Sequence, residues 1–281
     1  MSERDGFQPG VPCWVDTLQP DPGAAAAFYG ELFGWEAAAS LPAEAPAAGL
    51  PAEYRLCRLR GRDVAAIGSQ PSGASQRAPV WGTYVWVDDP EETASRAAEA
   101  GGRVLFEPFD SLDGGRMAVI ADPGGAVLGV WRPGEHRGAQ LVNEPGAWSM
   151  SALNSRDPDG AKAFYGTVFG WEAEALELGG AEATMWRLPG FVGGEPEQPV
   201  PRDVVATMIP MEGEGDPDDA PAHWSVDFWV GEVKAAAERV AELGGQVIAP
   251  PYDIPGTQLR QAVVADPQGA AFSVTEVTVG S

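Results

Sequence analysis

The chain has 281 residues, 44% of them hydrophobic, and 18 Lys and Arg against 41 Asp and Glu give a net charge of −23. This length can bury a sizeable core and predicts about two domains. So negative a surface repels nucleic acid phosphates and anionic lipids, so neither is expected as a partner. Cys13 and Cys57 are too few for a disulfide framework or a thiolate metal cluster. Without an apolar run typical of a signal peptide or a membrane span, we expect a cytoplasmic protein.

Strands and helices alternate along the first half of the chain. PCWVDTL (12–18) predicts a strand, and a helix follows over 22–34, where Pro22 suits the first turn and Gly34 the end. The elements predicted after this helix are strands at 53–59, 62–68 and 82–88, a helix at 91–102, and strands at 103–108, 116–122 and 125–131. The alternation indicates a βαβββ unit that occurs four times in the whole chain.

An internal repeat determines the architecture. FYGELFGWEA, from Phe28, is nearly repeated as FYGTVFGWEA, from Phe164, at an offset of 136 residues. Other landmarks recur in the same order: WGTYVWVDDP (from Trp81) as WSVDFWVGEV (from Trp224), Gly101-Gly102 as Gly244-Gly245, and RMAVIADPGGA (from Arg116) as RQAVVADPQGA (from Arg260). Landmarks in a fixed order indicate duplication of the whole unit, with a small insertion in the second copy. We predict two similar domains, at 1–132 and 147–281, joined by a Gly- and Pro-rich linker at 133–146.

These motifs resemble a known superfamily. A helix that contains FY and ends in LFGW, a later helix that ends in GG, and a DPxG turn before the last strand are similar to the vicinal oxygen chelate proteins, over residues 11–132 and 146–277. That superfamily includes glyoxalase I, extradiol dioxygenases and bleomycin-resistance proteins. The tandem form resembles two-domain actinobacterial glyoxalase-like proteins that carry the label hydroxylase. The resemblance implies an α+β fold of tandem paired βαβββ modules. They would form two cupped mixed sheets with helices on the outer face and the ligand in the cup.

Metal-dependent members of this superfamily place His, Gln or Glu at inward-facing strand positions. The resemblance maps these positions onto Trp14, Gly82 and Gly129 in the first copy, and onto Trp148 or Met150, Ser225 and Ser273 in the second. None of these side chains is a competent ligand beyond a weak hydroxyl. The two histidines lie elsewhere, with His136 in the linker and His223 ahead of its strand. We therefore predict no metal and no cofactor, with a carboxylate-only metal site as the alternative.

Strand alternation assigns the residues that face each cup. If Gly82 faces the cup, apolar residues such as Val226 and Phe228 fall on the rear face. The predicted ligand-binding residues are Trp14, Tyr84, Trp86, Trp131, Trp148, Met150, Asn154 and Trp229. Aromatic walls with few polar groups suit a flat ligand that is largely apolar or cationic. The alternative is that these rings fill the interior of the sheet.

Asp16 and Asp227 are the predicted catalytic residues, because burial among aromatic rings would raise the pKa of either carboxyl and make it a better base near neutral pH. Either carboxylate could instead pair with a cationic ligand group or serve a structural role.

Two functions follow from the sequence. The first is metal-independent binding of an aromatic or largely apolar small molecule, for sequestration and resistance or in secondary metabolism. The alternative is a glyoxalase-like lyase, isomerase or dioxygenase, either metal-free with an Asp base or with unorthodox metal ligands. The sequence leaves open whether the protein is an enzyme, and we expect a monomer or homodimer.

Overall fold

The computed structural model describes residues 3–39, 51–71, 78–111, 115–178, 181–193, 202–211 and 221–278. The first copy contributes β1 (Pro12–Gln19), α1 (Pro22–Phe33), β2 (Glu36–Ala39), β3 (Tyr54–Leu59), β4 (Arg62–Ser69), β5 (Trp81–Trp86), α2 (Pro90–Glu99), β6 (Arg103–Asp110), β7 (Arg116–Ala121) and β8 (Val127–Arg132). The second copy contributes β9 (Trp148–Ser155), α3 (Pro158–Phe169), β10 (Glu172–Leu178), β11 (Ala181–Arg187), β12 (Val204–Pro210), β13 (His223–Trp229), α4 (Val233–Glu242), β14 (Gln246–Asp253), β15 (Leu259–Ala265) and β16 (Ala271–Val277).

Each copy forms one eight-stranded mixed sheet. The strand orders are β2-β3-β4-β1-β5-β8-β7-β6 and β10-β11-β12-β9-β13-β16-β15-β14. In the first sheet β1 pairs parallel to β4 and antiparallel to β5, so two βαβββ modules join at the centre. The expected α+β fold of tandem paired modules is confirmed. The sequence analysis did not locate β2, because its EAAA sequence has low strand propensity and the strand forms by pairing with β3.

The first helix of each copy begins and ends as its sequence indicates. In α1 the Asp21 side chain accepts from the Ala24 N–H, Pro22 occupies the first turn, and Gly34 ends the helix with a φ of 76°. A non-glycine residue would be strained at that left-handed position. In α3, Asp157 and Gly170 play the same two roles. None of the helices in the described part of the chain is long and apolar enough to cross a membrane.

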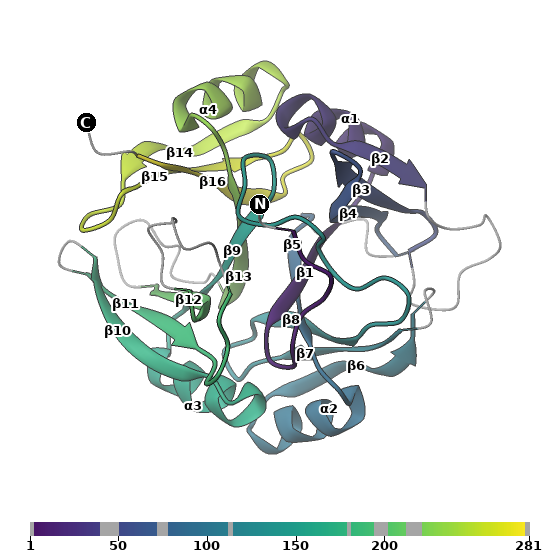
Figure 1. The fold of residues 1–281 in the computed structure, drawn as a ribbon, viewed down its shortest axis with the longest axis vertical. Coiled ribbons are helices and arrows are strands. Elements are labelled where there is room, and N and C mark those ends of the chain that lie inside the picture. Colours follow the sequence, from purple (N-terminus) through teal and green to yellow (C-terminus); the bar gives the residue numbers. More distant parts are fainter. Residues whose placement is uncertain are drawn as a thin grey trace.

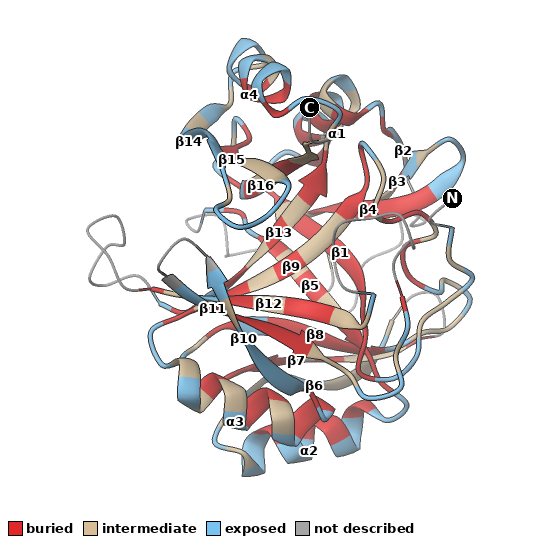
Figure 2. Ribbon diagram, turned by 60° about the vertical axis from the view of Figure 1, so that its left-hand side comes forward, coloured by how far each residue is buried: buried red, intermediate tan, exposed pale blue. Residues whose placement is uncertain are grey.

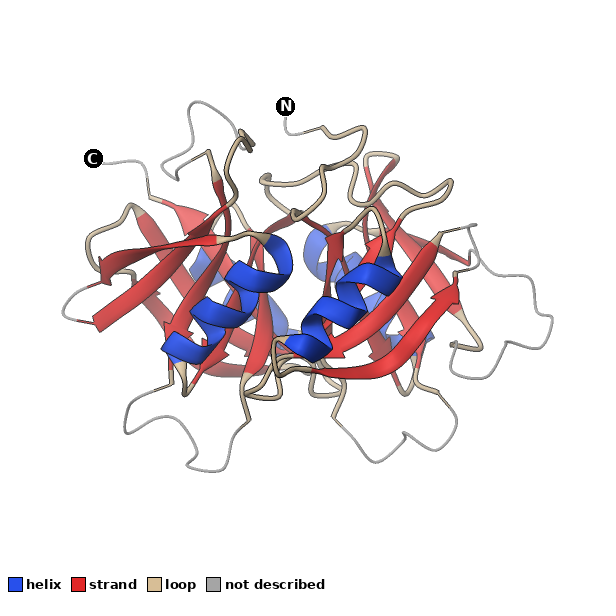
Figure 3. Cartoon of the chain, turned by 90° about the horizontal axis from the view of Figure 1, so that it is seen from below, coloured by secondary structure: helices blue, strands red, loops and turns tan. Residues whose placement is uncertain are grey.

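The two copies pack as one body. The central strands β1, β5, β9 and β13 lie in the middle, with α1 beside α4 at one end and α2 beside α3 at the other (Figure 1). The same pairing of helices is visible from below in Figure 3. The central strands are largely buried, while the outward faces of the helices are exposed (Figure 2). The ring of Phe33 on α1 lies 5.1 Å from that of Phe228 on β13, so the first helix packs on the sheet of the other copy.

The repeated phrase forms the contact between the copies. The Tyr29 hydroxyl of the first copy donates to Asp266 Oδ2 of the second at 2.9 Å. In return the Tyr165 hydroxyl of the second copy donates to Asp122 Oδ2 of the first at 3.1 Å. Each aspartate belongs to a DPxG turn, where its other oxygen accepts backbone N–H groups. The sequence analysis had assigned these two aspartates to turns, and the structure adds their role in joining the copies.

The tryptophan that ends each phrase makes a second reciprocal contact. Trp35 Nε1 donates to the carbonyl of Gly146, which precedes β9, and Trp171 Nε1 donates to that of Gly10, which precedes β1, both at 2.7 Å. All four residues are buried, and a buried polar group without a hydrogen bond is costly. Each copy therefore fixes the start of the other copy's first strand.

We predict that Tyr165→Phe lowers the free energy of unfolding by about 1–3 kcal/mol, because it removes a buried donor to Asp122. Tyr29→Phe should cost less, since Gln19 Nε2 still donates to Asp266 Oδ2 at 2.8 Å. Urea denaturation of both variants measures the difference. Tyr252→Phe is the matched control, because that tyrosine is 40% exposed. Equal stability of Tyr165→Phe and the control would contradict this role for the hydroxyl.

Candidate functional site

A buried carboxylate lies at the centre of the first cup. Asp16, on β1, is 5% exposed, and its Oδ2 accepts from the hydroxyls of Tyr54 at 2.9 Å and Tyr84 at 3.0 Å. Trp14 Nε1 donates to the Tyr54 hydroxyl at 3.2 Å. Burial raises the pKa of Asp16 to about 6, although the two tyrosine hydrogen bonds oppose the rise. The structure thus gathers Trp14, Asp16 and Tyr84 and adds Tyr54, which the sequence analysis missed.

The linker passes over this cup and fills it. The imidazole of His136 stacks on Trp131 with ring centroids 5.4 Å apart and meets the edge of Trp14 at 4.4 Å. Its Nε2 lies 3.7 Å from Oδ2 of Asp63 on β4. The sequence analysis placed His136 in the linker, but nothing in its local sequence indicated that the linker folds back into the cup.

The residue after His136 continues this contact. The guanidinium of Arg137 lies 5.7 Å from the centroid of the Trp86 ring, a cation–π geometry. Phe7, from the N-terminal segment, lies 6.5 Å from the same ring. The Ala139 N–H then donates to the carbonyl of Cys13 on β1 at 2.8 Å. Trp86 and Trp131 therefore contact the protein's own chain.

The second cup has a different polar centre. Asp227, on β13, is half-buried, and it accepts from Ser149 Oγ and Thr275 Oγ1, each at 2.8 Å. Burial raises the pKa of Asp227 to about 6, with the hydroxyl hydrogen bonds acting in the other direction. Gln261 Nε2 donates to Thr275 Oγ1 at 3.1 Å, and the Tyr252 hydroxyl donates to Gln261 Oε1 at 2.5 Å. This network connects Asp227 to an exposed tyrosine.

A β-bulge brings Ser149 into this network. The pairing of β9 with β13 shifts between Met150, which lies opposite Asp227, and Trp148, which lies opposite Phe228. Simple alternation would put Ser149 on the rear face, so the sequence analysis missed it. Trp148 belongs to the same core cluster as Phe228.

The remaining residues predicted for the second cup lie along its central strands. Asn154 Nδ2 donates to Ser225 Oγ at 3.1 Å across β9 and β13. Trp229 follows Asp227 by two residues on β13, which puts both on one face. Within the described residues, Trp229 forms no aromatic pair and no cation–π pair, and its exposed fraction, 9%, equals that of Trp86.

Other groups occupy the space at the positions that the resemblance assigns to metal ligands. A Cβ on Gly129 would lie 2.2 Å from the Tyr84 ring, so that ring occupies the space of a ligand side chain. A Cβ on Gly82 would lie 3.1 Å from Asp16 Oδ1. In the second cup Ser225 already donates to the carbonyl of Ala152. Across the described ranges, no three His, Cys, Asp or Glu side chains gather as metal ligands do.

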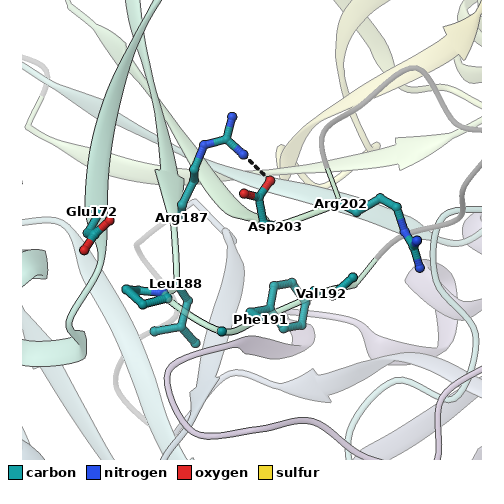
Figure 4. Close-up of a pocket in the computed structure, with 9 residues that line it drawn as sticks. Glu172, Arg187, Leu188, Phe191, Val192, Arg202 and Asp203 are labelled. Carbon is teal, nitrogen blue, oxygen red and sulfur yellow. Dashed lines mark hydrogen bonds and ion pairs between the residues drawn. The ribbon is translucent and has the colours of Figure 1, made fainter.

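A separate groove of about 360 Å³ lies at the edge of the second sheet (Figure 4). The loop between β11 and β12 forms one wall with Leu188 and Phe191, and Arg187 forms the other. Arg187 is ion-paired with Asp203 and Glu174, and Arg202 Nε donates to a loop carbonyl. None of the site residues predicted from the sequence lines this groove.

Comparisons with known proteins agree with the fold and the duplication. The sequence model of the family described as "Glyoxalase-like domain" matches twice, at residues 14–130 and 137–275. The chain therefore belongs to the glyoxalase-like domain family, with two copies of the domain. This confirms the resemblance to the vicinal oxygen chelate superfamily.

Full-length relatives extend this likeness. "Putative glyoxylase CFP32" of Mycobacterium tuberculosis is 38% identical over 277 residues, which cover 98% of this chain and 97% of that protein. "Anthracycline biosynthesis protein DnrV" of Streptomyces peucetius is 33% identical over 287 residues, which cover 98% and 96%.

Solved structures share the fold at low identity. A Mn(II)-bound glyoxalase from Novosphingobium aromaticivorans aligns with a TM-score of 0.62 and 16% identity, over 97% of this chain and 83% of that one. The 2,3-dioxygenase LapB from Pseudomonas sp. KL28 aligns with a TM-score of 0.61 and 11% identity, over 96% and 93%. At this identity the likeness concerns the fold alone.

We predict that Asp16→Asn raises the free energy of unfolding by about 2–3 kcal/mol at pH 7 and has little effect near pH 4. The raised pKa means that the folded protein binds this proton more tightly than the unfolded chain does. The wild type therefore loses stability as pH rises through about 6, and the neutral amide does not. Urea denaturation between pH 4 and 8 measures both proteins.

Asp253→Asn is the control for this experiment, because Arg260 lowers the pKa of that exposed carboxyl and the sign is reversed. A stability difference between Asp16→Asn and the wild type that does not vary with pH would contradict the assignment.

Proposed function

We propose that the second cup binds an aromatic or largely apolar small molecule without a metal. The observation that carries this proposal is the difference between the two cups. The linker fills the first cup with His136 and Arg137. In the second, Met150 is half-buried, whereas Trp14, which occupies its position in the first copy, is buried. Asp227 and its counterpart Tyr84 are both half-buried. In this proposal the second cup takes the ligand, and the first stabilises the fold.

The composition of the second cup supports a small ligand held by few polar groups. Met150 and Trp229 supply apolar surface, and Asp227 with its two hydroxyl donors supplies one polar anchor. Binding sites for small molecules commonly combine apolar walls with a few fixed polar groups. Membership of the glyoxalase-like family and the likeness to a protein named for anthracycline biosynthesis agree with a ligand of this class. The role would be sequestration or a step in secondary metabolism.

One observation favours a catalytic alternative. Asp227 has a pKa raised to about 6, and Ser149 and Thr275 fix the orientation of its carboxylate. A carboxylate with such a pKa is mostly ionised at pH 7 and accepts a proton more readily than an exposed one. A metal-free isomerase or lyase would use Asp227 as its base. Turnover of a bound ligand, lost in Asp227→Asn while binding persists, distinguishes this activity from binding alone.

We predict that Trp229→Ala weakens the binding of a neutral probe, 2-naphthylmethanol, by about 1–3 kcal/mol, because it removes one wall of the proposed site. Trp86→Ala is the matched control, since its ring contacts Phe7 and Arg137 and not the ligand. That control should keep its affinity and lose stability. Isothermal titration calorimetry and thermal melts measure the two quantities. Equal loss of affinity in both variants would contradict the assignment of the site to the second cup.

A further inference from the structure

The first cup contains a cation that the chain itself supplies, the guanidinium of Arg137. Asp63 accepts from Arg58 Nε at 2.7 Å and lies near His136, and Arg137 lies over the face of Trp86. Both linker side chains end in a planar group. The imidazole of His136 stacks on Trp131, and the guanidinium of Arg137 lies over Trp86. A planar cation therefore occupies the position in which the proposed function puts a ligand in the other copy.

The second cup keeps the receptor half of this arrangement. Trp229 recurs at the position of Trp86 in the repeated strand, and Asp227 lies about 7 Å away along the same face. Asp227 receives hydrogen bonds from Ser149 and Thr275. In the part of the chain that the structure describes, no Lys, Arg or His forms an ion pair with it.

A half-buried carboxylate with hydroxyl donors but no cation is an incomplete ion pair. Withdrawing a carboxylate from water is costly unless a positive charge or further hydrogen bonds compensate. The net charge of −23 adds a long-range attraction for a positive ligand. A tryptophan two residues from the carboxylate on the same face of β13 favours a cation that is also flat or joined to a flat ring.

We propose that the second cup selects planar aromatic molecules that carry a positively charged nitrogen, with the ring on Trp229 and the cation paired with Asp227. This deepens the proposed function and rests on it. The guanidinium of Arg137 on Trp86 in the first cup is then an internal counterpart of that ligand. The selectivity resides in Asp227, while the apolar affinity resides in Trp229.

Two isosteric probes separate the proposal from the function on which it rests. Calorimetry compares 2-naphthylmethylammonium with neutral 2-naphthylmethanol on the full chain. We expect the cation to bind about tenfold more tightly, and Asp227→Asn to abolish that preference by weakening the cation more than the neutral probe. Trp229→Ala should weaken both probes. Asp253→Asn, which removes an exposed carboxylate on β14, should change neither.

A pH titration of the wild type gives a second, variant-free measurement. The groups that face Asp227 are Ser149 on β9, Thr275 on β16, Gln261 on β15 and, through it, Tyr252 on β14. Asp227 therefore controls the charge, and the preference for the cation should fall as pH drops below about 6.

The outcomes distinguish the two ideas. Equal binding of both probes by the wild type, at every pH from 5 to 8, overturns the selectivity for cations and leaves the small-molecule site standing. A preference for the cation that persists in Asp227→Asn also overturns it. Binding of neither probe overturns the selectivity together with the proposed function.

Discussion

The hydrogen bonds between tyrosine and aspartate across the two copies are the constraint on which the rest of the structure depends. Tyr29 and Tyr165 each lie on the first helix of one copy and donate a hydrogen bond to the aspartate of the DPxG turn in the other. Because each turn precedes the last strand of its sheet, these bonds fix both sheets relative to both first helices. The residues assigned to the cups make none of these hydrogen bonds, so the inner faces of the cups can differ without disturbing the contact between the copies. The asymmetry of the cups is possible because the symmetric contacts lie elsewhere.

That asymmetry separates two uses of one architecture. In the first cup the linker contributes an imidazole and a guanidinium, and aromatic rings close around them. In the second, hydroxyl groups orient a carboxylate that is still half-buried. The two carboxyls reach a similar pKa by the same physical cause, loss of water. Asp16 is buried and held by tyrosines, whereas Asp227 is half-buried and held by shorter side chains. Similar acidity therefore does not imply similar access.

The fold was predictable from the sequence because the duplicated motifs and the alternation of apolar residues along the strands are visible in runs of consecutive residues. Pro22 and Gly34 mark the ends of the first helix correctly. The site was less predictable, because it depends on contacts between distant segments. A bulge at Ser149 interrupts the alternation from which Trp148 was assigned, and no pattern in the linker reveals that His136 returns to Trp131. Tyr54 was missed because its strand was assigned no face.

The helix α1 packs on strands that are translated last. Phe33 contacts Phe228 and Phe272, which lie about two hundred residues later in the chain. As the protein leaves the ribosome, the aromatic face of this helix stays uncovered until nearly the whole polypeptide has been made. Exposed apolar surface of this kind invites aggregation or chaperone binding during synthesis. A duplicated protein whose halves share their cores thus gains a rigid joint between its copies and a long interval in the cell during which the first half is incomplete.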